Sequence, residues 1–412
     1  MSTETTATGF LGWIDKRFPL TKVWNEHLAQ YYAPKNFNFW YYFGSLALLV
    51  LVLQIVTGIW LAMNYKPSAA DAFASVEYIM RDVDWGWLIR YMHSTGASFF
   101  FIAVYLHMFR ALMYGSYRKP RELLWIIGLI IYLAMMATAF FGYLLPWGQM
   151  SYWGAQVIVN LFAAVPGIGE DLSVWVRGDY VISDATLNRF FAFHFLLPFV
   201  LAALVFVHIV ALHKVGSNNP DGIEIKENKD ENGIPRDGIP FHPYYTVKDI
   251  AGIAVFLAVF SAVVFFAPDL GGLFLEGPNF IPANPLKTPE HIAPVWYFTP
   301  FYAMLRAIPP MFGSQFPGVV VMFAAILIMF FLPWLDRSPV KSVRYKGPIF
   351  KAALALFAIS FVVLAYLGLQ SSTPARTLAA QVFTGLYFAF FLLMPFYSKM
   401  EKTKPVPERV TK

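Results

Sequence analysis

Four histidines occur in two apolar segments, and each segment carries its pair at the same interval. The members of each pair are 14 residues apart: His93 and His107 in the segment 87–113, and His194 and His208 in the segment 187–213. On a straight helix, 14 residues return to within about 40° of the same face and advance about 21 Å along the axis. The histidines of each segment are therefore predicted to share a helix face and to lie near opposite membrane surfaces.

Imidazoles inside a membrane are expensive to bury and usually functional. Across the two helices they form two pairs, His93 with His194 and His107 with His208. A zinc ion would need its ligands to converge on one point, whereas these pairs are about 20 Å apart. Two axial imidazoles at each level suit a six-coordinate haem iron between helices. The alternative is core histidines hydrogen-bonded across a bundle, but the doubled interval favours haem.

Glycines repeat the same interval in two further apolar runs, Gly44 with Gly58 and Gly128 with Gly142. Glycine has no side chain, so another body can approach the helix backbone closely at these positions. Ordinary packing of small residues between membrane helices is the alternative explanation. Because the glycines share the histidine interval, we interpret them as the places where two haems pack against neighbouring helices.

The composition is that of a polytopic membrane protein. The chain has 412 residues, of which 58% are apolar and 14% charged, and such a composition is typical of multi-pass proteins. It contains no cysteine, so a haem here must be non-covalent and disulfides are excluded. The net charge of +6 follows the membrane topology and does not indicate nucleic-acid binding.

Eight apolar runs are long enough to cross a membrane, and they predict an all-α fold with eight transmembrane helices. The runs cover residues 40–62, 87–113, 123–145, 187–213, 247–267, 317–335, 348–369 and 377–398. Residues 10–31 mix aromatic and basic side chains, as in a helix that lies in the membrane interface. The first 39 residues include Asp15 and Glu26 and lack a continuous apolar core, so we expect no cleaved signal peptide.

Most of the 31 Lys and Arg residues lie in the N-terminal segment, in alternate loops and in the C-terminal tail. The positive-inside rule then places both termini in the cytoplasm and His93 and His194 toward the outer surface. The predicted organisation has five parts: a cytoplasmic interfacial segment (1–39), a four-helix di-haem domain (40–216), a polar cytoplasmic loop (217–240), a C-terminal four-helix domain (241–398) and a cytoplasmic tail (399–412).

Three loops stand out by composition. The outer loops 146–186 and 268–316 are rich in Pro, Gly and aromatic residues, which is typical of ordered functional loops. The loop 217–240 is charged, and we expect it to be mobile.

Arg90 and Arg110 lie one turn from His93 and His107, where each could pair with a haem propionate or simply extend to the interface.

Long motifs distributed over nearly the whole chain resemble the cytochrome b subunit of ubiquinol:cytochrome c oxidoreductase, the respiratory cytochrome bc complex. They include RYMHSTGASFFFIAVYLHMFR, GYLLPWGQMSYWGAQVIVNL, TLNRFFAFHFLLPF, HKVGSNNPDG and TPEHIAPVWYF. The second half belongs to the same chain, as in the fused bc-type subunit and unlike the photosynthetic form with a separate subunit.

The resemblance implies a subunit that carries two non-covalent b-type haems in a multi-pass protein of the bacterial cytoplasmic membrane. In a Q cycle, quinol, expected to be ubiquinol, is oxidised at an outer site and quinone is reduced at an inner site. The implied partners are a Rieske iron-sulfur protein, a cytochrome c-type subunit, membrane lipid and a second copy of the complex in a homodimer. The low-potential haem is assigned to His93 and His194, and the high-potential haem to His107 and His208.

The resemblance also implies residues for both quinone sites. The inner-site residues are His213, Ser217 and Asp249, with Lys248 nearby; a helix cap and a membrane anchor are the alternatives for Asp249 and Lys248. The outer site includes the motif Pro294, Val295, Trp296 and Tyr297, in which many relatives have glutamate in place of valine. We expect Glu290, Tyr143, Tyr302 or a water chain to replace that proton acceptor, with Glu290 the first choice and a solvated loop acid its alternative role.

Other classes explain the sequence less completely. A different two-haem quinone-linked anchor would use the histidines but leave the second half without a role. A transporter or proton channel would predict more acids inside the first four spans, and these are almost free of acids. A membrane scaffold would not need four matched histidines.

Overall fold

The computed structural model describes residues 9–311 and 313–411, and nearly all of its regular structure is helical. In that part of the chain, eight helical segments are long and apolar enough to cross a membrane. Their helices are α3 (Tyr42–Ala62), α5 (Gly86–Tyr114), α6 (Glu122–Leu144), α9 (Asp184–Val215), α10 (Thr246–Phe266), α12 with α13 (Phe316–Leu327 and Leu332–Leu335), α14 (Pro348–Leu369) and α15 (Pro374–Leu392). The all-α polytopic prediction with eight transmembrane helices is confirmed.

Local signals in the sequence fix several helix ends. Ser183 precedes α9, and its backbone N–H donates to the Thr186 hydroxyl oxygen at 3.1 Å, which satisfies one N–H group at the start of the helix. Thr373 accepts a hydrogen bond from the Arg376 N–H at the start of α15. Gly115 ends α5 with φ +66°, and a methyl group there would lie 2.6 Å from the Lys341 carbonyl oxygen. Glycine is therefore required at Gly115 both by the backbone and by its neighbour.

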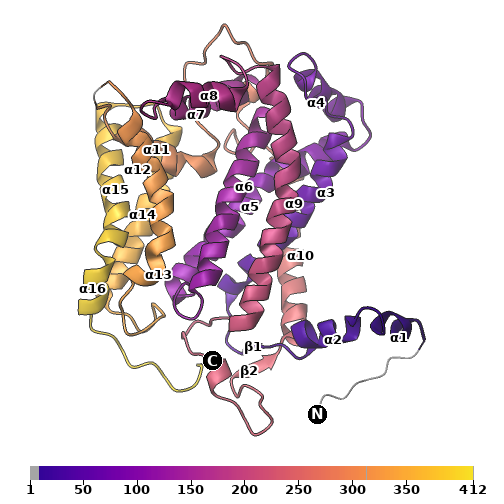
Figure 1. Ribbon diagram of the computed structural model, residues 1–412, viewed down its shortest axis with the longest axis vertical. Coiled ribbons are helices and arrows are strands. Elements are labelled where there is room, and N and C mark those ends of the chain that lie inside the picture. Colours follow the sequence, from indigo (N-terminus) through magenta and orange to yellow (C-terminus); the bar gives the residue numbers. More distant parts are fainter. Residues whose placement is uncertain (1–8, 312, 412) are drawn as a thin grey trace.

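Short helices lie at the two ends of the bundle (Figure 1). At one end lie α4 (Ala72–Arg81), α7 (Gln149–Ala163) and α8 (Gly169–Arg177), and α11 (Thr299–Ala307) lies near them. The opposite end carries α1 (Gly9–Asp15), α2 (Leu20–Trp24), α16 (Met394–Met400) and the antiparallel pair of β1 (Tyr32–Pro34) and β2 (Gly238–Pro240). The loops predicted to share a membrane side thus share an end of the molecule.

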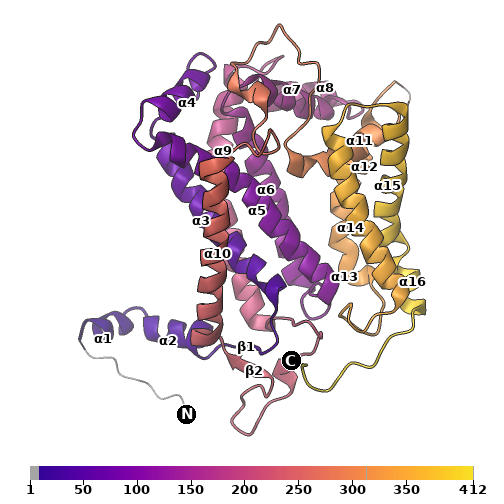
Figure 2. The ribbon, with the colours of Figure 1, turned by 180° about the vertical axis from the view of Figure 1, so that it is seen from behind.

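The N-terminal segment projects sideways from the bundle (Figures 1 and 2). Phe10, Leu11 and Trp13 on α1 are exposed, as expected for a helix that lies in a membrane interface. The predicted helix over 10–31 is interrupted between α1 and α2, where Pro19 precedes Leu20. Residues 1–8 of the predicted 1–39 segment lie outside the described residues.

The polar loop 217–240 packs against the body of the protein, so the prediction of a mobile loop is wrong. Asp221 is buried and accepts hydrogen bonds from Arg344, Tyr345 and Thr411. Glu224 pairs with Arg121 at 2.6 Å, and Arg409 pairs with Asp237 at 2.8 Å. Three acids of the loop, Asp221, Glu224 and Asp237, are thus paired with basic residues from distant parts of the chain.

The helix α10 packs against α3 and α5, although the sequence groups it with the second half. Both views place it beside the first four spans and away from α12 to α16 (Figure 2). The second half proper consists of α11, α12, α14 and α15, which contact one another.

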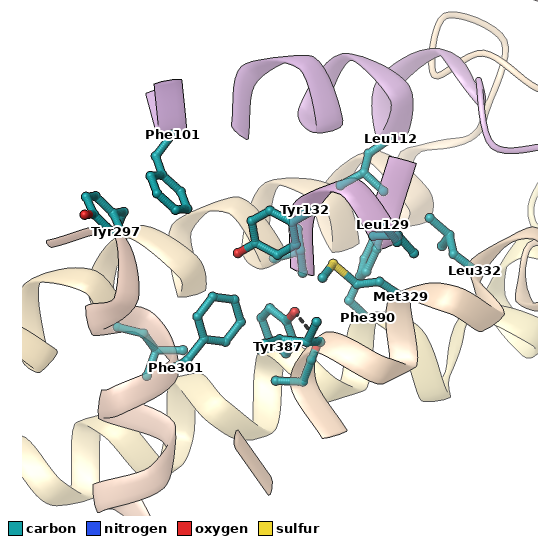
Figure 3. Packing of buried hydrophobic residues seen from close by; sticks show 14 of the residues in the cluster. Phe101, Leu112, Leu129, Tyr132, Tyr297, Phe301, Met329, Leu332, Tyr387 and Phe390 are labelled. Atoms are coloured by element: carbon teal, nitrogen blue, oxygen red, sulfur yellow. Dashed lines mark hydrogen bonds between the residues drawn. The ribbon is translucent and has the colours of Figure 1, made fainter. Parts of the chain in front are cut away.

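The main apolar core joins the two halves (Figure 3). Leu129 and Tyr132 of α6 lie in one buried cluster with Tyr387 and Phe390 of α15. The Tyr387 hydroxyl donates to the Ala325 carbonyl at 2.8 Å, so this polar group is satisfied inside the core. This shared core holds the first four spans against the helices of the second half.

Candidate functional site

Each of the four histidines faces one of the four predicted glycines. The helix α3 packs along α5, and α6 packs along α9, which brings the glycine helices onto the histidine helices. A methyl group built on the glycine would lie within 3.3 Å of the imidazole Cε1 in every case: 3.3 Å for Gly44 and His107, 3.0 Å for Gly58 and His93, 3.3 Å for Gly128 and His208, and 2.3 Å for Gly142 and His194. The shared interval in the sequence therefore corresponds to direct contacts in space.

The spacing of the outer pair would suit one metal ion held between the two imidazoles. The ring centroids of His93 and His194 are 6.0 Å apart and their planes are nearly perpendicular. Two imidazoles that each bind one metal ion at about 2 Å through a ring nitrogen place their centroids about 6 Å apart. The separation therefore fits an iron between the two rings.

Hydrogen bonds fix the tautomers of the outer pair. His194 Nδ1 donates to the Thr138 carbonyl at 2.8 Å. The Thr57 hydroxyl donates to the Leu53 carbonyl at 2.7 Å and accepts from His93 Nδ1 at 2.9 Å. Both rings then carry their proton on Nδ1 and keep the Nε2 lone pair for a metal.

Beside the inner pair lie an arginine and buried nitrogen atoms without hydrogen-bond partners. Arg110 lies beside His107, with Nη2 3.1 Å from the imidazole Nδ1, and its guanidinium lies 4.9 Å from the centre of the Tyr41 ring. Arg110 Nε and His208 Nδ1 are buried without a hydrogen-bond partner among the described atoms. Unsatisfied buried donors are rare in folded proteins, so this level is suited to an anionic group that pairs with Arg110.

No group of three or more His, Cys, Asp or Glu side chains within residues 9–311 and 313–411 is arranged to hold a bare metal ion. His93 lies beside His194, and His107 interacts electrostatically with His208. Such pairs are incomplete for zinc but sufficient for an iron whose other four ligands come from a macrocycle.

A cavity of about 530 Å³ opens at the outer pair. Its wall includes His93, His194, Gly58 and Gly142, and Arg90 also lines it. Most of the wall is apolar, which is typical of cofactor sites with a few convergent polar groups. Arg90 thus faces the same space as the two imidazoles.

The same cavity extends to the predicted outer quinol site, where Tyr143, Val295 and Tyr297 line it. The motif after Pro294 is held rigidly: the Tyr297 ring stacks on Phe101 with centroids 3.9 Å apart, and the Trp296 indole donates to Ser98 at 3.0 Å. The structure therefore brings the valine of the motif next to the space around the outer histidines.

The two long outer loops are bonded to each other. The side-chain oxygen of Gln149 accepts a hydrogen bond from the Asn284 backbone N–H at 2.7 Å. The backbone N–H of Gln149 donates to the Ile281 carbonyl at 3.0 Å. Asn279 accepts the Ser151 N–H at 2.7 Å. These bonds hold the loop after α10 over the end of α6, where Tyr143 lies.

Sequence reasoning missed Glu276 at this site. The Tyr143 hydroxyl donates to Glu276 Oε2 at 3.1 Å, and burial raises the pKa of Glu276 to about 7 despite hydrogen bonds from Tyr143 and Asn279. Glu290, the predicted first choice, is exposed, and Tyr302 donates to the Ile292 carbonyl at 3.3 Å. Neither is among the described residues that line the cavity. The sequence offered no signal for Glu276, because its partner lies more than 130 positions earlier.

The predicted inner-site residues lie at the opposite end. The His213 ring lies 4.6 Å from that of Tyr31, and the Tyr31 hydroxyl is 3.0 Å from Ser217 Oγ. Lys248 Nζ lies 4.4 Å from the centre of the Tyr244 ring, and Asp249 is half-buried beside Ser45. Tyr31, which the sequence did not single out, thus joins His213 and Ser217.

This fold and site define a class: a multi-pass helical membrane protein with paired histidines suited to haem between its helices. The chain matches two protein families, Cytochrome b/b6/petB over residues 28–216 and Cytochrome b(C-terminal)/b6/petD over residues 282–388. It is 76% identical over 415 residues to a protein named Cytochrome b from Allochromatium vinosum, with 100% of both chains covered.

Two further relatives agree. A protein named Cytochrome b from Rhodospirillum rubrum is 51% identical, covering 97% of this chain and 96% of the relative. A solved chain titled Hyperthermophilic respiratory Complex III is similar with a TM-score of 0.87 and 42% identity, covering 95% of this chain and 99% of that chain. The chain belongs to the cytochrome b family, and haem b binding follows from that membership.

Proposed function

We propose that the chain is the haem- and quinone-binding core subunit of a quinol:cytochrome c oxidoreductase, and that it oxidises quinol at an outer site and reduces quinone at an inner site. As a cytochrome b of complex III type, it is a subunit of a proton-translocating oxidoreductase. The observation that carries the proposal is the set of four histidines facing four glycines at two levels.

Two non-covalent b-type haems are assigned to the two histidine pairs, the low-potential haem to His93 and His194 and the high-potential haem to His107 and His208. When bound, the haems carry single electrons between the two quinone sites. The 6.0 Å centroid separation of the outer pair and its Nδ1 hydrogen bonds support the first assignment. Arg90 and Arg110 are proposed to pair with haem propionates.

The outer quinol site is assigned to the end of the cavity lined by Tyr143, Val295 and Tyr297. Its mostly apolar wall can exclude water and hold a quinol ring near the outer histidine pair. Pro294 and Trp296 complete the motif that positions this wall, with Trp296 anchored on Ser98. A quinol held here would give up electrons close to the outer haem.

The inner quinone site is assigned to His213, Ser217, Lys248 and Asp249. His213 and Ser217 meet through Tyr31, and an imidazole and a hydroxyl at this end can hydrogen-bond and protonate a reduced quinone. Lys248 and Asp249 begin α10 at the same end of the molecule.

The remaining proposals concern location and partners. The protein is a multi-pass membrane protein, proposed to lie in a bacterial cytoplasmic membrane with both termini in the cytoplasm. Within a bc-type complex it is proposed to form a homodimer among membrane lipids and to pass electrons to a Rieske iron-sulfur protein and a cytochrome c-type subunit. Ubiquinone is the proposed quinone.

Redox-titrated visible spectra of the purified complex test the haem assignment, with His194→Ala and His208→Ala compared to wild type. We expect two b-type components in the wild type, loss of the lower-potential one in His194→Ala and loss of the higher-potential one in His208→Ala. A single wild-type component, or two components that survive both substitutions, would refute the four-histidine assignment.

A further inference from the structure

Glu276 is a partly buried acid at the outer site that the proposed function does not yet use. It begins the turn Gly277–Phe280 in the loop after α10, and its carboxylate accepts the hydroxyl hydrogen of Tyr143 at 3.1 Å. Tyr143 lines the cavity beside the outer histidine pair, whereas Glu276 is not among the described residues of its wall. Tyr143 therefore contacts both the cavity and the carboxylate.

At the motif position where many relatives have glutamate, this chain has Val295, which lines the same cavity and is 4% exposed. Valine cannot accept a proton. A quinol that loses two electrons must also lose two protons, so an apolar site needs a base or a relay to remove them. The described cavity wall carries one carboxylate of its own, Glu77, which pairs with Arg81 at 2.6 Å. Through Tyr143 the wall reaches a second carboxylate, Glu276, which has no such basic partner.

We propose that Glu276 replaces the missing motif glutamate as the proton acceptor of the outer quinol site, and that it receives the proton through the hydroxyl of Tyr143. This inference rests on the proposed function.

The proton transfer balances as a relay. A quinol O–H bond breaks and its proton binds the Tyr143 oxygen, while the original hydroxyl proton of Tyr143 binds Glu276 Oε2. Tyr143 is left neutral and unchanged, and the carboxylate becomes a carboxylic acid. The two electrons would go to the iron-sulfur protein and to the haem held by His93 and His194. Glu276 then releases this first proton toward the outer surface, and the same relay carries the second quinol proton.

The surroundings of Glu276 suit a carboxylate that takes up a proton and then releases it. The groups with electrostatic or hydrogen-bond contact to its carboxylate are Tyr143, Tyr297 and Asn279, and none of them carries a positive charge. Burial raises the pKa of Glu276 to about 7, so the carboxylate is half protonated near neutral pH and can both take and release a proton.

The test is steady-state quinol:cytochrome c reductase activity of the intact complex between pH 5.5 and 8.5, with decylubiquinol as the probe. In the wild type we expect the rate to rise with pH through about 7, because the deprotonated carboxylate is the acceptor. Glu276→Gln is expected to lower the rate about 100-fold, the typical contribution of a general base, and to lose the rise near pH 7. Asp84→Asn, which removes an exposed outer acid, is the matched control and should match the wild type.

Two further variants separate the relay from a structural effect. Tyr143→Phe keeps the ring but removes the hydroxyl, and it should lose the same rise near pH 7. Val295→Glu in the Glu276→Gln background places a carboxylate on the cavity wall, and it should restore the rate at least tenfold. Both b-type spectral components should persist in every variant, which shows that the complex is folded.

Either of two results overturns this inference: a Glu276→Gln rate close to wild type, or a low rate that still rises with pH through about 7. Loss of activity in Glu290→Gln with Glu276→Gln unaffected is the first result in its clearest form. A wild-type complex with no quinol:cytochrome c activity would instead refute the proposed function and this inference with it.

Discussion

Gly142→Ala is the single-atom change that should disturb the outer histidine pair most. The added methyl carbon would lie 2.3 Å from Cε1, 2.6 Å from Nδ1 and 2.9 Å from Nε2 of His194. Ordinary contact begins near 3.4 Å, so the imidazole or the helix α6 must move by about 1 Å. Alanine is favoured over glycine in a helix by about 1 kcal/mol, but overpacking a tight contact costs about 1–3 kcal/mol.

The displacement matters more than its energy, because metal–ligand distances are maintained within about 0.2 Å. A ligand displaced by about 1 Å cannot keep its bond to an iron that is also held by His93. We therefore expect redox-titrated spectra of the Gly142→Ala complex to lose the lower-potential b-type component and to keep the higher-potential one.

Alanine substitutions at two other glycines serve as controls for this prediction. Gly128→Ala on the same helix would place its methyl 3.3 Å from His208 Cε1, so the lower-potential component should survive that substitution. Gly385→Ala on α15 has nothing within 4 Å and should leave both components as in the wild type. If Gly142→Ala retained both components at unchanged potentials, the reasoning that places His194 against this glycine would be refuted.

Two more predictions concern the support of the site and of the polar loop. Thr57→Val removes the oxygen that accepts the His93 Nδ1 hydrogen; the less basic imidazole stabilises ferric iron less, so the lower midpoint potential should rise, and haem affinity should fall about 10–100-fold. Asp221→Asn weakens its hydrogen bonds with Arg344 and Thr411 and should lower the free energy of unfolding by about 2–3 kcal/mol, measured as a lower thermal transition of the purified protein.

Each of these has a distinguishing control. Thr57→Ser keeps the hydroxyl and should keep the wild-type potential, so an equal shift in both variants would contradict the role of the hydrogen bond. Glu231→Gln removes an exposed acid from the same loop as Asp221 and should not change the transition. An Asp221→Asn protein as stable as Glu231→Gln would show that the buried carboxylate does not hold the loop.

The spans and the histidine pairs could be predicted from the sequence because both depend on local patterns. A long apolar run must be helical in a membrane to satisfy its backbone, and a 14-residue interval fixes the face and depth of two side chains on one helix. The glycines followed from the same interval, and all four meet a histidine. Each interval needs only the geometry of one helix, whereas the contacts between glycines and histidines also need α3 to pack on α5 and α6 on α9.

The sequence was less informative wherever the answer depended on which segments meet. It predicted a mobile loop over 217–240, because charged residues usually remain solvated, yet basic side chains more than 100 positions away in sequence pair with Asp221 and Glu224. It grouped α10 with the second half, although the helix packs on α3 and α5. The sequence of an apolar helix does not show which other helix it packs against.

What the sequence by itself determined is therefore the set of helices and the matched spacing of His93, His107, His194 and His208; their direction through the membrane stays a prediction. Only the tertiary structure decided that the partly buried acid beside Tyr143 is Glu276 and that Glu290 is exposed. The physical reason is that helical periodicity is a local property, whereas the burial of a loop side chain depends on the fold of the loops around it. In this chain the two outer loops are joined by hydrogen bonds between Asn279 and Ser151 and between Gln149 and Asn284.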